Sequence, residues 1–169
     1  LYPTMEDKDL KGQSAMMRAA ILVFEHHPSF SMISFITQWG ITRLADEDWT
    51  TGQSNGHPVP STGMRIVGKV FKEVEATQTV DVAMKAAPIL AEALKHSPYN
   101  MNNQRYKAIV YRIMGKKDKA IEIYLRLISK HRQSYLFHEL SNLLDDEQQK
   151  IALLCKAISS QREEKFRQR

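Results

Sequence analysis

The segment from His138 to Asn142 reads His-Glu-Leu-Ser-Asn and differs by one residue from the pattern by which metalloproteases bind zinc. That pattern needs two histidines four residues apart on one helix face, with the glutamate between them as general base. Asn142 takes the place of the second histidine, and a carboxamide is not among the usual zinc ligands. The segment therefore predicts an ordinary helix without a metal site.

Gly115-Lys116 has the residue order that ends a phosphate-binding loop. Such a loop also needs an earlier glycine, which lets the backbone approach the phosphate, and a Ser or Thr that binds magnesium. Val110 and Lys117 occupy those two positions. Gly115 instead predicts the left-handed residue that commonly terminates a helix.

Other reactive side chains also lack the partners that catalysis requires. His26 and His27 are adjacent, so a helix points them about 100° apart, which is poor geometry for one metal ion. Cys155 falls on an apolar helical stripe with Ile151 and Ile158 and is predicted to be a core residue. We therefore predict a protein that is not an enzyme and needs no cofactor.

Apolar positions recur with helical spacing along the chain, and no strand is indicated. We expect an all-α fold of about eight helices joined by short connections. The predicted helices cover residues 14–26, 29–39, 61–77, 81–96, 103–114, 118–130, 134–144 and 147–162. Between Asp46 and Pro60, glycines and prolines interrupt the pattern. We expect an N-terminal helical segment over residues 1–60 and a helical-repeat region over residues 61–169, packed as one domain.

A regular pattern of small and aromatic residues lies in the middle of the repeat region. Two antiparallel helices approach closely where small residues lie at their crossing and large residues fill the sides. The pattern consists of Ala108, Tyr111, Gly115, Ala120, Tyr124 and Leu127. This spacing predicts two helices that turn at Gly115 and pack against each other.

These residues resemble the tetratricopeptide repeat, a helix–turn–helix unit of 34 residues. The resemblance is best over residues 102–132 and implies a right-handed superhelix of antiparallel helix pairs that binds a protein or peptide. A preceding unit ends at Pro98, where the family closes a repeat with proline. In a following unit, Leu154 and Ala157 come 30 residues after Tyr124 and Leu127, and that unit is shorter than the family's repeat.

The resemblance also implies a partner-binding face. In the family, residues of each first helix that face away from the second helix line a concave groove. The matching positions here are Asn102, Arg105, Tyr106, Arg112, Arg132, Tyr135, Glu139 and Asn142. Their arginines are suited to grip carboxylates and their tyrosines to supply contact area. Ile109, Ile113 and Leu136 share this face. These three residues and Tyr106 are either groove residues or core against a neighbouring layer.

Charge divides the chain unevenly. Residues 1–98 hold 9 Lys and Arg against 11 Asp and Glu, a net charge of −2, whereas residues 99–169 hold 15 against 8, a net charge of +7. Such a basic half is either the footprint of a nucleic acid or a set of helix faces solvated by lysine and arginine.

A second resemblance concerns other segments. Trp39-Gly40, Leu44, Asp48, Pro60-Ser61 and the later Asp145-Asp146 and Cys155-Lys156-Ala157 are similar to a repeat-like module of bacterial conflict systems that carry primases and helicases. This resemblance implies an alternative function as an accessory domain beside nucleic-acid enzymes. The protein-interaction scaffold and this accessory domain are the two functions that the sequence leaves open.

The compartment follows from what the chain lacks. No apolar run reaches the ~20 residues of a membrane span. The segment from Leu1 to Lys11 does not have the basic start and apolar middle of a signal peptide. A single cysteine suits a reducing compartment. We expect a cytoplasmic protein with no membrane partner, and the sequence leaves its oligomeric state open.

Overall fold

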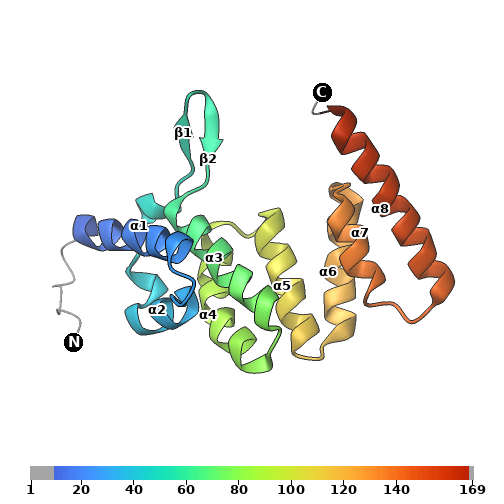
Figure 1. Ribbon diagram of the computed structural model, residues 1–169, viewed down its shortest axis with the longest axis horizontal. Coiled ribbons are helices and arrows are strands. Elements are labelled where there is room, and N and C mark those ends of the chain that lie inside the picture. The colour runs from blue at the N-terminus through green and yellow to red at the C-terminus, as the bar shows by residue number, and fades with distance from the viewer. Residues whose placement is uncertain (1–9, 168–169) are drawn as a thin grey trace. The chain divides into compact units, whose positions relative to one another are not determined.

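The computed structural model describes the backbone of residues 10–167 and the side chains of residues 12–161 (Figure 1). The described part contains eight α-helices, which confirms the predicted mostly helical fold, together with two 3-10 turns, Ile41–Arg43 and Asp46–Trp49. The helices are α1 (Leu10–His26), α2 (Met32–Trp39), α3 (Thr62–Thr77), α4 (Val80–His96), α5 (Met101–Ile113), α6 (Lys117–Lys130), α7 (Ser134–Ser141) and α8 (Glu147–Arg167).

The chain divides into two compact units, Leu1–Pro98 and Tyr99–Arg169, called here the N-terminal and C-terminal units. This division differs from the boundary expected after residue 60. Helix α3 packs against both α1 and α2, so residues 61–98 belong with the helices that precede them. The two units coincide with the acidic and basic halves of the sequence.

A short hairpin corrects the expectation that the chain has no strand. Strands β1 (Gly52–Ser54) and β2 (His57–Val59) pair antiparallel, with Gln53 opposite Pro58. Asn55 and Gly56 form the turn at φ values of 52° and 77°, as Asn-Gly does in tight hairpins. Proline is tolerated here because both strands of a two-stranded sheet are edges. The Asn-Gly pair was the signal for this hairpin in the sequence.

Side chains distant in the sequence fix the helices of the N-terminal unit. On α3, Glu73 accepts hydrogen bonds from the Met32 amide at 2.6 Å and from the Ser31 hydroxyl at 2.7 Å. A carboxylate at the start of α2 is favoured by the helix dipole. Ser14, where the first helix was expected to begin, lies inside α1, and its hydroxyl donates a hydrogen bond to Asp48.

The C-terminal unit consists of two consecutive helix pairs, α5 with α6 and α7 with α8 (Figure 1). Gly115 lies at φ 72° between α5 and α6, as its predicted role as a helix terminator requires. All four helices contribute to the hydrophobic interior. Its buried members are Ala108, Ala120, Ile123, Tyr124, Leu127, Leu136, Leu140 and Leu143, and Leu153 of α8 packs against them. The antiparallel pairing of helices α5 to α8 confirms the predicted architecture.

Replacing Ala120 by leucine is expected to lower the free energy of unfolding by about 1–3 kcal/mol, because extra methylenes overpack a filled core. Ala120 and Ala108 are both fully buried in the cluster that joins α5 to α6. Thermal or urea unfolding measures the change. The same substitution at exposed Ala152 is a control, and equal stability of the Ala120→Leu variant and the parent would contradict close packing at this position.

Candidate functional site

Two residues of the predicted binding face are bonded to each other. On α5, Nε of Arg105 donates to both carboxylate oxygens of Glu139 on α7, each at 2.9 Å, and Nη2 also bonds one of them. Only 17% of the Arg105 side chain and 19% of the Glu139 side chain are exposed. The guanidinium that was expected to grip a ligand carboxylate therefore holds a carboxylate of the protein itself.

Two aromatic residues of the predicted set surround this ion pair. The guanidinium carbon of Arg105 lies 5.3 Å from the ring centroid of Tyr135 and 5.9 Å from that of Tyr106. The Tyr135 hydroxyl in turn donates to Sδ of Met101 at 3.8 Å. Four of the eight predicted residues thus gather on one half-buried cluster between α5 and α7.

Tyr124 of α6 also belongs to this cluster, because its phenol is hydrogen-bonded with Glu139. Burial raises the pKa of its phenol strongly, and the negative charge of Glu139 and a hydrogen bond with it raise the pKa further, while Arg105 and Arg112 oppose the shift. The phenol is therefore neutral and available as a donor to the carboxylate. The sequence pattern assigned Tyr124 to packing alone and missed this polar role. A tyrosine one helix turn after Ala120 carries no signal for a bond to α7.

The remaining predicted residues are Asn102, Arg112, Arg132 and Asn142, and the charge of Arg112 acts on the Tyr124 phenol of this cluster. Asn102 is exposed in the first turn of α5, and Asn142 is exposed at the C-cap of α7. Arg132 lines a cavity of about 580 Å³ with residues of α6, α7 and α8, among them Leu125 and Lys156. The part of these residues in binding stays a prediction, as does that of Arg112.

Two of the three aliphatic residues of the predicted face, Ile109 and Leu136, are core residues. Ile109 and Leu136 are 2% and 0% exposed, so neither is a groove residue, and Ile113 is half-buried. Of the two alternatives that the sequence left open for Ile109 and Leu136, core packing is the one that the structure shows.

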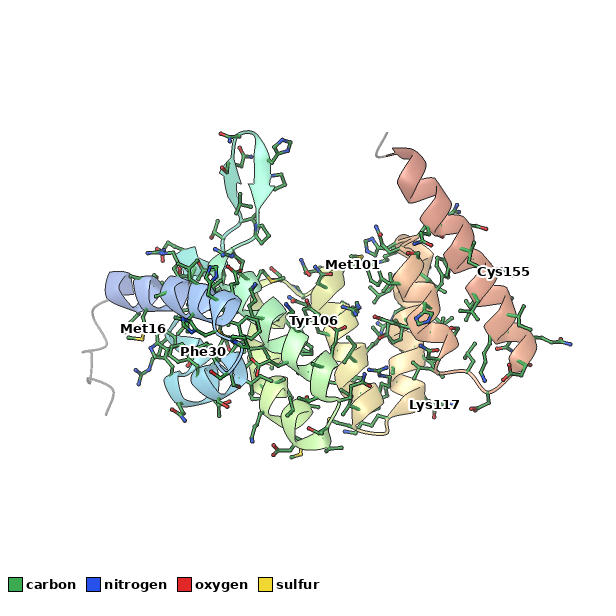
Figure 2. All side chains as sticks on the ribbon, viewed as in Figure 1. Met16, Phe30, Met101, Tyr106, Lys117 and Cys155 are labelled. Carbon is green, nitrogen blue, oxygen red and sulfur yellow. The ribbon has the colours of Figure 1, made fainter. Side chains whose placement is uncertain are left out.

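Helix α8 exposes the face that was predicted to be buried. Ile151, Leu154 and Ile158, called here the α8 stripe, are 59%, 39% and 54% exposed. Cys155 beside them is also exposed (Figure 2), so its prediction as a core residue was wrong. The helix turns Leu153 toward the interior instead. Because α8 is apolar on more than one side, its periodicity did not distinguish the inner face from the outer one.

A groove runs between α7 and α8 along this stripe. Its volume is about 410 Å³. It is lined by Ser134, Tyr135 and His138 of α7 and by Leu154, Ala157, Ile158 and Gln161 of α8. Tyr135 is the predicted binding residue that belongs to it. The groove therefore combines aliphatic surface from α8 with hydroxyl and imidazole groups from α7.

The described residues contain neither a metal-binding cluster nor a membrane-spanning helix. No group of three or more His, Cys, Asp or Glu side chains in that part of the chain could hold a metal ion. Within the same residues, no helix is long and apolar enough to cross a membrane.

The chain is similar to a solved structure and, over part of its length, to a family model. No curated protein matches the chain. A solved structure titled "Crystal structure of MamA" is similar over 98% of this chain and 99% of its own, with 16% sequence identity and a TM-score of 0.46. Residues 103–169 match the family model described as a domain of unknown function (DUF7017). The C-terminal unit is thus similar to that domain along most of its length.

Proposed function

We propose that the chain is a non-catalytic scaffold that binds a partner protein through the α8 stripe and the groove between α7 and α8. The observation that carries this proposal is the exposure of Ile151, Leu154 and Ile158, which are 59%, 39% and 54% exposed at helical spacing on one face. Contiguous apolar patches on a protein surface commonly mark interaction sites.

In the same unit, helix α6 has apolar residues at the positions that correspond to the α8 stripe, and these residues are covered by other helices. Ile121, Tyr124 and Ile128 precede the three residues of the α8 stripe by 30 positions each, the offset of the shortened repeat. These α6 residues pack in the interior, to which α7 contributes Leu136 and Leu140. The α8 stripe therefore has the residue types that receive a further helix, in the same order along the chain.

The chemistry of the face indicates the kind of partner. Helix α7 presents Leu136 and Leu140, four residues apart, to the interior. A partner helix with aliphatic residues at that spacing would fit the α8 stripe, as amphipathic helices fit apolar grooves. The hydroxyl of Tyr135 and the imidazole of His138 line the groove, where they can form hydrogen bonds with polar side chains at the edge of the partner helix. We therefore expect an amphipathic helical segment as the ligand, rather than an acidic peptide held by Arg105.

Replacing Leu154 by arginine is expected to lower the affinity for the partner at least about 30-fold, since burying a leucine contributes about 1.5–3 kcal/mol and a charge would be buried in its place. Tagged protein captures the partner from extract of the source cells, and titration of the purified partner measures the affinity. Leu125→Arg is the matched control, because Leu125 is 52% exposed on α6 and does not line this groove.

The single cysteine offers a second measurement of the same contact. Cys155 is exposed and adjacent in sequence to Leu154, so a partner on the α8 stripe should slow its alkylation by a maleimide. Unchanged alkylation in the complex, or retention of the partner by Leu154→Arg, would place the contact elsewhere on the molecule and refute this site.

A further inference from the structure

Three lysines surround the ring of Tyr111 where α5 turns into α6. The ammonium nitrogens of Lys107, Lys116 and Lys119 lie 5.9, 5.9 and 5.8 Å from the centroid of that ring. Lys107 lies one helical turn before Tyr111 on α5, Lys116 is the N-cap of α6, and Lys119 is in its first turn. The tight turn thus brings charges from two helices to one aromatic side chain.

No carboxylate in the described part of the chain balances this cluster. Neither Lys107, Lys116 nor Lys119 forms an ion pair there, whereas the neighbouring Lys117 is paired with Asp145. Because all three share one ring, their mutual distances are comparable with the Debye length of about 8 Å at physiological ionic strength, and their repulsion is only partly screened. An anion bound among them would relieve that repulsion.

We infer that this turn binds single-stranded nucleic acid, with the lysines at the phosphates and the Tyr111 ring against a base. Lysines along a backbone path and an aromatic ring for stacking are the two components of such sites. Tyr111 is half-buried, so part of its ring packs on the core and the rest is accessible. The net charge of +7 on residues 99–169 would attract a polyanion toward the turn.

The type of cation favours phosphate over the carboxylates of an acidic protein. Arginine is the residue that holds a carboxylate by two parallel hydrogen bonds, and in this unit Arg105 already holds Glu139 through Nε and Nη2. Lysine acts as a compact point charge, which suits successive phosphates of a flexible strand. This site lies at the α5–α6 turn and is distinct from the groove between α7 and α8.

The test is the binding of a fluorescein-labelled oligothymidine, followed by anisotropy over a series of salt concentrations. Single-strand binding weakens with salt with a slope of about −0.7 per phosphate contact, so replacing all three lysines by glutamine should make the slope less steep by about 2. The matched control replaces Arg126, Lys130 and Lys156 by glutamine. It removes the same charge from the same unit away from Tyr111, and its slope should change little.

The ring is tested separately. Tyr111→Leu is expected to weaken oligothymidine binding about 5- to 100-fold at every salt concentration, because stacking does not depend on counterions, whereas Tyr111→Phe keeps the affinity. The lysine variant leaves the Tyr111 ring in place, so its salt dependence tests the site even if Tyr111→Leu unfolds. Absence of oligothymidine binding, equal loss in the control variant, or equally strong competition by poly-glutamate at matched charge would overturn the inference.

Discussion

Replacing Arg105 by alanine is expected to lower the free energy of unfolding by about 2–3 kcal/mol. Removing one partner of a buried ion pair costs about 3–5 kcal/mol because the other charge is left without compensation, and the remaining exposure of 17% and 19% reduces that figure. The Glu139 carboxylate would lose the guanidinium that compensates its charge and would keep the Tyr124 phenol as a neutral partner. Urea unfolding of the purified variant measures the change.

The reference for this prediction is a surface ion pair in the same unit. Lys117 and Asp145 form an ion pair whose side chains are 41% and 92% exposed, and Lys117→Ala should cost at most about 1 kcal/mol. In the double variant with Glu139→Leu added, part of the loss at Arg105 should be recovered because no charge is left unpaired. A loss at Arg105 no greater than that at Lys117 would show that the pair contributes nothing beyond a surface contact.

The same geometry changes what is expected of the arginines as ligands. On the sequence alone, Arg105 and Arg112 lie two helical turns apart, and replacing both by alanine should abolish partner binding with little effect on stability. The bonds from Arg105 to Glu139 make this double variant less stable, so a loss of binding would not by itself identify a ligand contact. Variants of the α8 stripe avoid this ambiguity because Leu154 is 39% exposed.

The helices could be predicted from the sequence because their signals are local. Gly115 ends α5 in the left-handed conformation that its type suggested, and Ala108 and Ala120 are buried together in the interior as their spacing required. Close packing at a helix crossing requires small residues at fixed offsets in the sequence. This spacing of small residues can be recognised without knowledge of the neighbouring layers.

The candidate site was harder to predict because it depends on contacts between layers. Arg105 and Glu139 are separated by 34 residues, one repeat length, so the repeat register places them side by side, but it does not distinguish a mutual ion pair from two ligand contacts. The sequence also did not predict which apolar side of α8 is covered by α7. Ile151 and Leu153 are both aliphatic, so the sequence does not show which of them faces the core. In the structure Leu153 packs against the core and Ile151 is exposed.

Alkaline solution is expected to destabilise the protein through Tyr124. Its pKa is raised in the folded state by burial and by Glu139, whereas in the unfolded chain it is about 10. Below pH 10 both states hold the proton and the group has no effect on stability. Above pH 10 the unfolded state loses the proton first, so stability should fall by up to about 1.4 kcal/mol for each further pH unit.

The contribution of Tyr124 can be isolated by comparing unfolding free energies between pH 9 and pH 12 for the parent and two phenylalanine variants. Tyr124→Phe removes the titrating group and should show a shallower decline above pH 10, although it is less stable at neutral pH because the Glu139 carboxylate loses a donor. Tyr99→Phe changes a side chain that is 91% exposed and should follow the parent. All three proteins contain the same lysines, so the contribution of the lysines cancels in the comparison. Parallel curves for the parent and Tyr124→Phe would mean that the phenol of Tyr124 ionises as readily in the folded state as in the unfolded chain. The hydrogen bond that Tyr124 donates to Glu139 would then contribute nothing to the contact between α6 and α7.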